Sequence, residues 1–205
     1  MTINIRPYQE TDFDALQEMI TETWYAGNYK LDPDATNTFS ALDTNLRLHD
    51  SSFGLTAEED GKVLGVFFGN IKNQEKTLKE NIQIDFEDVS TFAIDDNPVK
   101  RDVLTQLTNE IHANRYLDEH HGSQPDAVIE LFILSPAARG KGIGGKLWEN
   151  GLQVFADHDV KDYVLHTDSD CDYSFYDHKG LTPDKSYSYS TDPKYKYFLY
   201  AGEIK

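Results

Sequence analysis

The stretch VIELFILSPAARGKGIGGK, residues 128–146, gives the strongest indication of the fold. Its first half is apolar apart from Glu130, and Ser135-Pro136 ends the run. A strand that is covered on both faces of its sheet has such a nearly continuous apolar sequence. The second half is rich in glycine, and apolar residues recur at helical spacing after it. The sequence therefore predicts a central strand, a glycine turn and a helix in succession.

Hydrophobic patterns on both sides of this stretch predict further strands and helices. Apolar runs or alternation indicate strands at residues 3–6, 53–58, 63–69, 163–167, 187–189 and 195–200. Helical spacing indicates helices at residues 11–24, 34–49, 98–120 and 170–179. Residues 71–124 are polar apart from the helix near 98–120. Because no repeat or low-complexity linker interrupts the chain, we expect one domain over residues 1–205, of mixed α/β (α+β) class.

Charge and cysteine content narrow the class of protein. The 205 residues carry 19 Lys and Arg against 36 Asp and Glu, which gives a formal net charge of −17. A phosphate backbone or an anionic membrane surface is held by clustered basic residues, so we expect neither nucleic acid nor a membrane as the partner. The single cysteine excludes a disulfide framework and a multi-cysteine zinc site. Without a signal-peptide pattern at its start, the chain is predicted to be cytoplasmic.

The glycine turn is a predicted phosphate site. Backbone N–H groups at a helix start, with no side chains over them, bind anions, and the helix dipole adds about half a positive charge. Arg139, Lys141 and Lys146 add positive charge to this turn in an otherwise acidic chain. We therefore expect the turn to hold a phosphate group.

Three known phosphate-binding patterns overlap on the turn. Gly140-x-Gly142-x-x-Gly145 matches the dinucleotide fingerprint, although residues 135–139 separate it from the strand. The same residues with Lys146 nearly complete a P-loop, but Leu147 stands where a magnesium-binding Ser or Thr belongs. The third pattern is Arg139-x-x-Gly142-x-Gly144, following a strand that ends in Leu134-Ser135-Pro136.

On the third pattern the sequence resembles the GNAT superfamily of acetyl-CoA-dependent N-acetyltransferases. Phe175-Tyr176, a few residues before Gly180-Leu181, matches a second motif of that family. The resemblance covers most of the chain and becomes weaker between residues 73 and 123. Ser169, Asp172 and Leu181 depart from the family pattern around this second motif.

The resemblance implies a fold, a co-substrate and site residues. The fold is the acyl-CoA N-acyltransferase type, a central, mostly antiparallel mixed sheet with helices on both faces. The co-substrate is acetyl-CoA, and no metal is implied. The strand residues Phe132, Ile133 and Leu134 would face the pantetheine arm. The diphosphate would be held by Arg139, Gly140, Lys141, Gly142, Ile143, Gly144 and Gly145. Tyr176 would lie near the sulfur and protonate the leaving thiolate.

Glu130 is the candidate general base. An amine is mostly ammonium at neutral pH, so a base must accept its proton directly or through water. Glu130 is the one charged residue in the apolar strand, where burial would raise its pKa towards neutrality. Regular alternation would place it on the same face as Phe132 and Leu134. Alternatively, Glu130 lies at the sheet surface or in an ion pair with a lysine, and Tyr176 is a packed aromatic whose hydroxyl bonds a backbone carbonyl.

Other clusters are weaker candidates. Asp168-x-Asp170-x-Asp172 begins like a calcium loop, but it lacks the glycine and the glutamate that such a loop needs. A solvated acidic loop, or an acidic lip that attracts a cationic amine, is the better interpretation. The histidines lack the spacing of a zinc-binding helix, so no metal site is expected.

Two functions remain at this stage. The first is an N-acetyltransferase that transfers acetyl from acetyl-CoA to a primary amine by direct attack in a ternary complex. The acceptor would be a small-molecule or peptide amine, and a homodimer is compatible with the resemblance. The second is a non-catalytic acyl-CoA-binding or regulatory domain of the same fold.

Overall fold

The computed structural model describes residues 3–27, 32–76, 78, 96–138 and 140–205. The strands are β1 (Asn4–Pro7), β2 (Phe53–Glu59), β3 (Lys62–Ile71), β4 (Ala127–Leu134), β5 (Asp162–Asp168), β6 (Pro183–Tyr189) and β7 (Asp192–Glu203). The main helices are α1 (Phe13–Ile20), α2 (Pro33–Asp50), α4 (Pro98–His121), α5 (Ile143–Asp157) and α6 (Ser174–His178). A π-helical turn, Thr21–Tyr25, continues α1.

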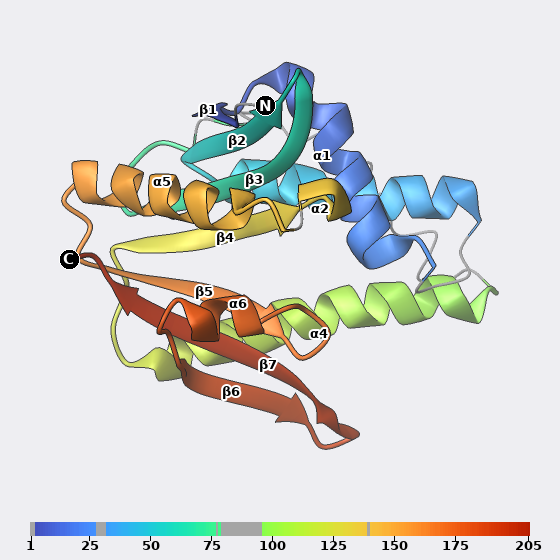
Figure 1. Cartoon of the computed structure of the whole chain (residues 1–205). Helices are drawn as coiled ribbons and strands as arrows, with labels where there is room; N and C mark the ends of the chain where they lie inside the picture. Colours follow the sequence, from blue (N-terminus) through green and yellow to red (C-terminus); the bar gives the residue numbers. More distant parts are fainter. Residues whose placement is uncertain (1–2, 28–31, 77, 79–95, 139) are drawn as a thin grey trace.

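The strands form one seven-stranded sheet in the order β1-β2-β3-β4-β5-β7-β6 (Figure 1). Neighbouring strands are antiparallel except β4 and β5, which are parallel. Antiparallel neighbours can be joined by a tight turn, and Asp60 and Gly61 do so between β2 and β3 with positive φ angles of 52° and 76°. The predicted mixed, mostly antiparallel sheet is confirmed.

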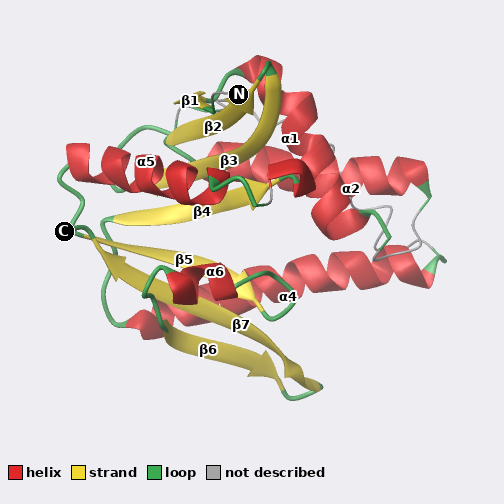
Figure 2. Ribbon diagram, viewed as in Figure 1, coloured by secondary structure: helices red, strands yellow, loops and turns green. Residues whose placement is uncertain are grey.

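Helices cover both faces of the sheet (Figure 2). On one face, α5 packs Leu147, Trp148 and Phe155 against strand residues such as Phe67. On the other face, α1 and α2 cover the first half of the sheet, and Val103 of α4 joins their core cluster. The other buried residues of α4, Ala113 and Leu117, pack under β5 and β7. The predicted flanking of the sheet on both faces is therefore confirmed.

The segment after β5 differs from its prediction. A helix over residues 170–179 was expected, but α6 comprises only Ser174–His178. The carboxylate of Asp168 accepts hydrogen bonds from the backbone N–H groups of Asp170 and Cys171, at 2.8 and 3.1 Å. This local turn competes with helical hydrogen bonding and delays the helix.

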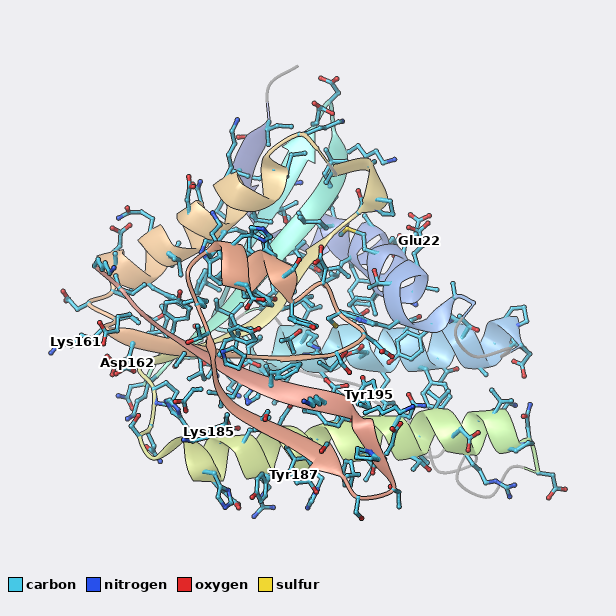
Figure 3. All side chains as sticks on the ribbon, turned by 60° about the horizontal axis from the view of Figure 1, so that its bottom comes forward. Glu22, Lys161, Asp162, Lys185, Tyr187 and Tyr195 are labelled. Atoms are coloured by element: carbon cyan, nitrogen blue, oxygen red, sulfur yellow. The ribbon has the colours of Figure 1, made fainter. Side chains whose placement is uncertain are left out.

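The last two strands are longer than predicted, and β6 lies beside α4. The ring of Tyr187 is 4.7 Å from that of Tyr116 on α4 (Figure 3). The long helix predicted near residues 98–120 is confirmed as α4, which Asn97 caps by accepting from the N–H of Val99 at 2.9 Å. Across the described ranges, no helix combines the length and the apolar character that a membrane span requires.

Candidate functional site

The site is centred on a fork between β4 and β5. Their parallel ladder has three residue pairs, Ala127↔Tyr163, Val128↔Val164 and Ile129↔Leu165. Beyond these pairs β4 continues to Leu134 and β5 to Asp168, and the two strands diverge (Figure 2). The edge of β4 from Glu130 to Leu134 therefore has no ladder partner in β5. An extended ligand can pair with such an open strand edge.

The closed end of the fork is fastened by reciprocal hydrogen bonds. Asp162 accepts from the N–H of Asp126 at 2.9 Å, and Asp126 accepts from the N–H of Lys161 at 3.0 Å (Figure 3 labels Lys161 and Asp162). These bonds hold the starts of β4 and β5 together. The divergence consequently begins at a defined residue, Glu130.

Glu130 is also the extra residue of a β-bulge. On β3, Phe68 pairs with Leu131 and Gly69 pairs with Ile129, which leaves Glu130 without a partner. A bulge reverses the alternation of side chains along the rest of the strand. Accordingly, Phe132 and Leu134 join the core beneath α5.

The prediction that Glu130 shares a face with Phe132 and Leu134 is therefore wrong. The carboxylate of Glu130 accepts a hydrogen bond from the side chain of Asn70 at 3.4 Å, and Arg47 of α2 donates to its backbone carbonyl at 3.1 Å. Both contacts lie on the α2 side of the sheet. The extra residue of the bulge explains the error, because strict alternation holds only in an uninterrupted strand.

Burial governs the ionisation of Glu130. It raises the pKa of the carboxyl above the ordinary value, and Asp50 adds to the increase. Arg47, the hydrogen bond from Asn70, and His166 act in the opposite direction. The raised pKa agrees with the sequence-based expectation for this residue.

The other strand residues of the predicted site divide between the two faces. The ring of Phe132 lies 5.0 Å from Phe175 and 5.6 Å from Trp148 on the α5 side. Ile133 is buried on the opposite side, with α1 and α2. Phe132, Ile133 and Leu134 therefore share the open backbone edge of β4 but no common side-chain surface.

The glycine turn has the backbone conformation that its sequence requires. Gly140 and Gly142 have φ angles of 71° and 69°, in the left-handed region that favours glycine. Gly142 precedes the first turn of α5, and no side chain caps this helix start. A Cβ on Gly144 would lie 2.8 Å from Leu134 Cδ1, so a larger residue here would require the Leu134 side chain to shift. Ile143 and Gly144 are buried, and Gly145 is half-buried.

The cations of the turn differ from those that the sequence suggested. Lys141 forms an ion pair with Glu59 at 2.7 Å, and Lys146 is exposed. Arg139 lies outside the described residues. Lys179, which directly follows α6, extends its ammonium group to within 3.8 Å of where a Cβ on Gly145 would stand. Sequence reasoning missed Lys179, because only the packing of α6 on α5 brings it to the turn.

Tyr176 lies on the same side of the fork as the glycine turn. Its ring packs 5.8 Å from Trp148 and 5.5 Å from Tyr200. Burial raises the pKa of its hydroxyl, so the group stays protonated. In the part of the chain that the structure describes, no group hydrogen bonds this hydroxyl. The alternative of a hydroxyl bonded to a backbone carbonyl therefore finds no support there.

The opposite side of the fork holds a charged cluster around Arg47. Its guanidinium donates to Asp43 at 3.0 Å and to Glu110 of α4 at 3.2 Å, in addition to the Glu130 carbonyl. The ring of Trp24 lies 5.9 Å from its central carbon. Burial, together with Asp43 and Asp168, raises the pKa of Glu110. This side therefore offers carboxylates with raised pKa values next to one cation.

Cys171 lies in the loop between β5 and α6. Burial raises the pKa of its thiol to about 11, and Asp168 contributes to the increase. A thiol with this pKa is protonated at neutral pH and is a poor nucleophile. Among the described residues, no three His, Cys, Asp or Glu side chains gather as metal ligands would.

Comparisons with known proteins bear on the family and the fold. The model of the family described as "Acetyltransferase (GNAT) family" matches residues 13–180. A search of curated proteins found no match. Among solved structures, a histone acetyltransferase HPA2 and related acetyltransferase from Corynebacterium glutamicum is 16% identical with a TM-score of 0.63, over 100% of this chain and 98% of that one.

Two further structures are similar over almost their whole length. PaiA N-acetyltransferase from Thermoplasma acidophilum, in complex with coenzyme A, is 16% identical with a TM-score of 0.56, over 99% of both chains. The ribosomal-protein-S18-alanine N-acetyltransferase from Escherichia coli is 12% identical with a TM-score of 0.56, over 100% of this chain and 95% of that one. At these identities the likeness shows the fold.

Proposed function

This chain belongs to the acetyltransferase (GNAT) family and is an acyltransferase; from that premise we propose that it transfers the acetyl group of acetyl-CoA to a primary amine. The amine would attack directly, with both substrates bound in the fork. The observation that carries the proposal is the arrangement on one side of the fork. There an uncapped glycine turn at the start of α5 and Tyr176, whose hydroxyl has no hydrogen-bond partner among the described residues, lie in the same cluster as Phe132 and Leu134 of the open β4 edge.

The residues present fit acetyl-CoA. When bound, this co-substrate supplies an activated acetyl group on a thiol leaving group. The open backbone edge of Phe132, Ile133 and Leu134 can hydrogen bond the amide groups of the pantetheine arm. The N–H groups at the start of α5, between Gly142 and Gly145, can hold the diphosphate, since a helix N-terminus favours anions. Lys179 adds a positive charge at the same turn.

The two titratable residues have complementary roles in the proposal. Glu130 accepts the proton that the ammonium group loses before attack, directly or through a water molecule. Its raised pKa favours this role, because a general base works best when its pKa is near the operating pH. As the new C–N bond forms and the C–S bond breaks, Tyr176 donates its proton to the departing sulfur. A hydroxyl with a raised pKa retains that proton until it is needed.

The acceptor is proposed as a small-molecule or peptide amine. A structural neighbour is named for acetylation of a ribosomal protein alanine, which supports an amine acceptor in this fold. The acidic loop from Asp168 to Asp172 contributes negative charge beside the fork, where it would favour a cationic amine. We further propose that residues 1–205 form a single catalytic domain that acts in the cytoplasm, alone or as a homodimer.

A combined binding and turnover experiment tests the proposal. Purified protein would receive acetyl-CoA and a panel of polyamines, aminoglycosides, amino acids and peptides, while free thiol and thermal stability are followed. Thiol release with one acceptor class, together with stabilisation by CoA, supports the N-acetyltransferase. Stabilisation without thiol release would favour the second candidate, a non-catalytic acyl-CoA-binding or regulatory domain. Absence of both would contradict the proposed site.

A further inference from the structure

We propose that Arg47 is a positioning residue that fixes the β4 bulge through the backbone carbonyl of Glu130 and so places this residue to accept a proton. The inference rests on the proposed function, because it assigns Arg47 through the role of Glu130. Three observations carry it: the bulge, the branching of the fork at the same residue, and the hydrogen bond that links both to α2.

The first step concerns the backbone of Glu130. As the extra residue of the bulge it has no partner on β3, and it is the first residue of β4 beyond the β5 ladder. A backbone carbonyl that leaves its ladder needs another hydrogen-bond donor when it is buried. Arg47 Nη1 donates to this carbonyl at 3.1 Å. The direction of β4 at the start of the open edge is therefore set by a side chain of α2.

The second step concerns how Arg47 is held. Its Nε donates to Asp43 on its own helix at 3.0 Å, and Nη2 donates to Glu110 on α4 at 3.2 Å. Asp43 is itself fixed, since it accepts a hydrogen bond from the buried hydroxyl of Tyr25 at 3.3 Å. The planar guanidinium thus bridges α2, α4 and β4 with three donor groups in one plane. A lysine has the same charge but cannot reproduce this geometry.

The third step concerns charge around Glu130. The charged groups that act on it come from two elements: Arg47 and Asp50 on α2, and His166 on β5. Each of them has a further partner: Asp43 and Glu110 accept from Arg47, Lys76 pairs with Asp50 at 3.0 Å, and Asp118 pairs with His166 at 2.9 Å. Among the described residues that act on Glu130, Arg47 is the permanent cation that opposes the effect of burial on its carboxylate. Its removal would shift Glu130 towards the protonated form.

Two substitutions separate geometry from charge. In Arg47→Met both are lost, so we expect the pKa of Glu130 to rise by about one unit, which is tenfold in the ionisation constant. The acid limb of the pH profile of kcat should shift to higher pH by the same amount, and kcat near neutral pH should fall about tenfold or more. In Arg47→Lys the charge stays, so the pKa of Glu130 should move little while kcat still falls about fivefold. Affinity for CoA should remain within twofold in both.

The measurements keep the inference separate from the proposed function. The titration of Glu130 is followed by carbon-13 NMR of labelled glutamate carboxyls, with Glu130→Gln to assign the signal, and needs no turnover. Arg115→Met is the matched control, because Arg115 also pairs with a carboxylate, Glu119 at 3.0 Å, but lies exposed on α4. Neither the titration nor kcat should change in this control.

Each outcome decides the inference. A raised pKa of Glu130 in Arg47→Met with unchanged CoA affinity supports it, and an unmoved titration overturns it. If Arg47→Met does not fold, Arg47→Lys decides alone: a reduced kcat at unchanged CoA affinity supports the inference, and a wild-type kcat overturns it. If no amine is acetylated by the wild-type protein, the proposed function fails. The titration still decides whether Arg47 holds Glu130.

Discussion

The two sides of the fork between β4 and β5 differ in the kinds of residue that line them. The α5 side has the glycine turn, the open strand edge and packed rings, among them Trp148 and Tyr176. On the α2 and α4 side, carboxylates surround the guanidinium of Arg47. One side therefore depends on backbone conformation and packing, which vary little with pH, whereas the other depends on ionisation.

This difference predicts how substitutions on each side would impair the proposed activity. Damage to the glycine turn on the α5 side should abolish binding of the co-substrate. Damage to the α2 and α4 side should leave that binding intact and change the rate and its pH dependence. Substitutions on the two sides therefore test the comparison directly.

The largest effect is expected at Gly142. Gly142→Val places a β-branched residue at φ 69° and adds a side chain over the N–H groups at the start of α5. We expect CoA affinity, measured by calorimetry, to fall about 1,000-fold, which corresponds to about 4 kcal/mol. Gly122→Val is the matched control, since Gly122 has φ 90° with equally open surroundings but ends α4. Equal loss of CoA affinity in both variants would show that backbone strain causes the loss, and not the side chain over the N–H groups of α5.

The next effect is expected at Tyr176. In Tyr176→Phe the ring packing stays and the proton donor is lost, so the single-turnover rate should fall about 100-fold. CoA affinity should stay within twofold. Because the pKa of Tyr176 is raised, its ionisation should cause no loss of rate up to about pH 10 in the wild-type protein. Tyr200→Phe is the control, as its hydroxyl donates to Asp177 at 3.0 Å. If the single-turnover rate is unchanged in Tyr176→Phe, Tyr176 is not the acid that protonates the thiolate.

On the opposite side, Glu130→Gln should reduce kcat/KM about 30-fold at neutral pH without weakening CoA binding. The same substitution should not lower the stability of the folded protein. The folded-state pKa of Glu130 is raised, so the folded protein binds this proton more tightly than the unfolded chain does. Ionisation above pH 4 to 5 therefore costs stability, and the neutral variant should melt at the same or a higher temperature at pH 7.5. A clear fall in melting temperature would indicate a structural role instead.

The smallest effect separates two lysines. Lys179→Met should weaken CoA binding about fivefold, or about 1 kcal/mol, with a smaller dependence on salt than the wild type shows. Lys141→Met should change it less than twofold, because Glu59 already holds that ammonium at 2.7 Å, whereas Glu149 lies 3.7 Å from the ammonium of Lys179. Titrations at two salt concentrations compare them. If Lys141→Met loses more CoA affinity than Lys179→Met, Lys141 is the lysine that binds the co-substrate, as the sequence predicted, rather than Lys179, as the packing indicates.

Most of the fold followed from local patterns. The apolar run before the glycine turn predicted β4, and the periodicity after Pro98 predicted α4. The family motif located Tyr176. These features depend on residues close together in the chain, which is why one sequence sufficed to find them.

The rest depended on contacts between distant segments. Nothing near Glu130 in the sequence indicates a bulge, because the extra residue is defined only by its pairing with β3. Lys179 and Arg47 reach the site through the packing of α6 and α2. The fork itself results from how β5 leaves β4, and no short pattern encodes the divergence of two strands.

The short ladder between β4 and β5 also has a consequence for local opening. The strands β5, β7 and β6 are joined to the rest of the sheet through three residue pairs, the bonds around Asp126, and packing against α4 on one face and α5 on the other. The free energy of local opening that exposes the amide hydrogens of β5 to solvent should therefore be lower than for β3, which is paired along most of both edges. A molecule seated along the open edge of β4 would bridge the two halves, so slower exchange in β5 would report that the fork is occupied.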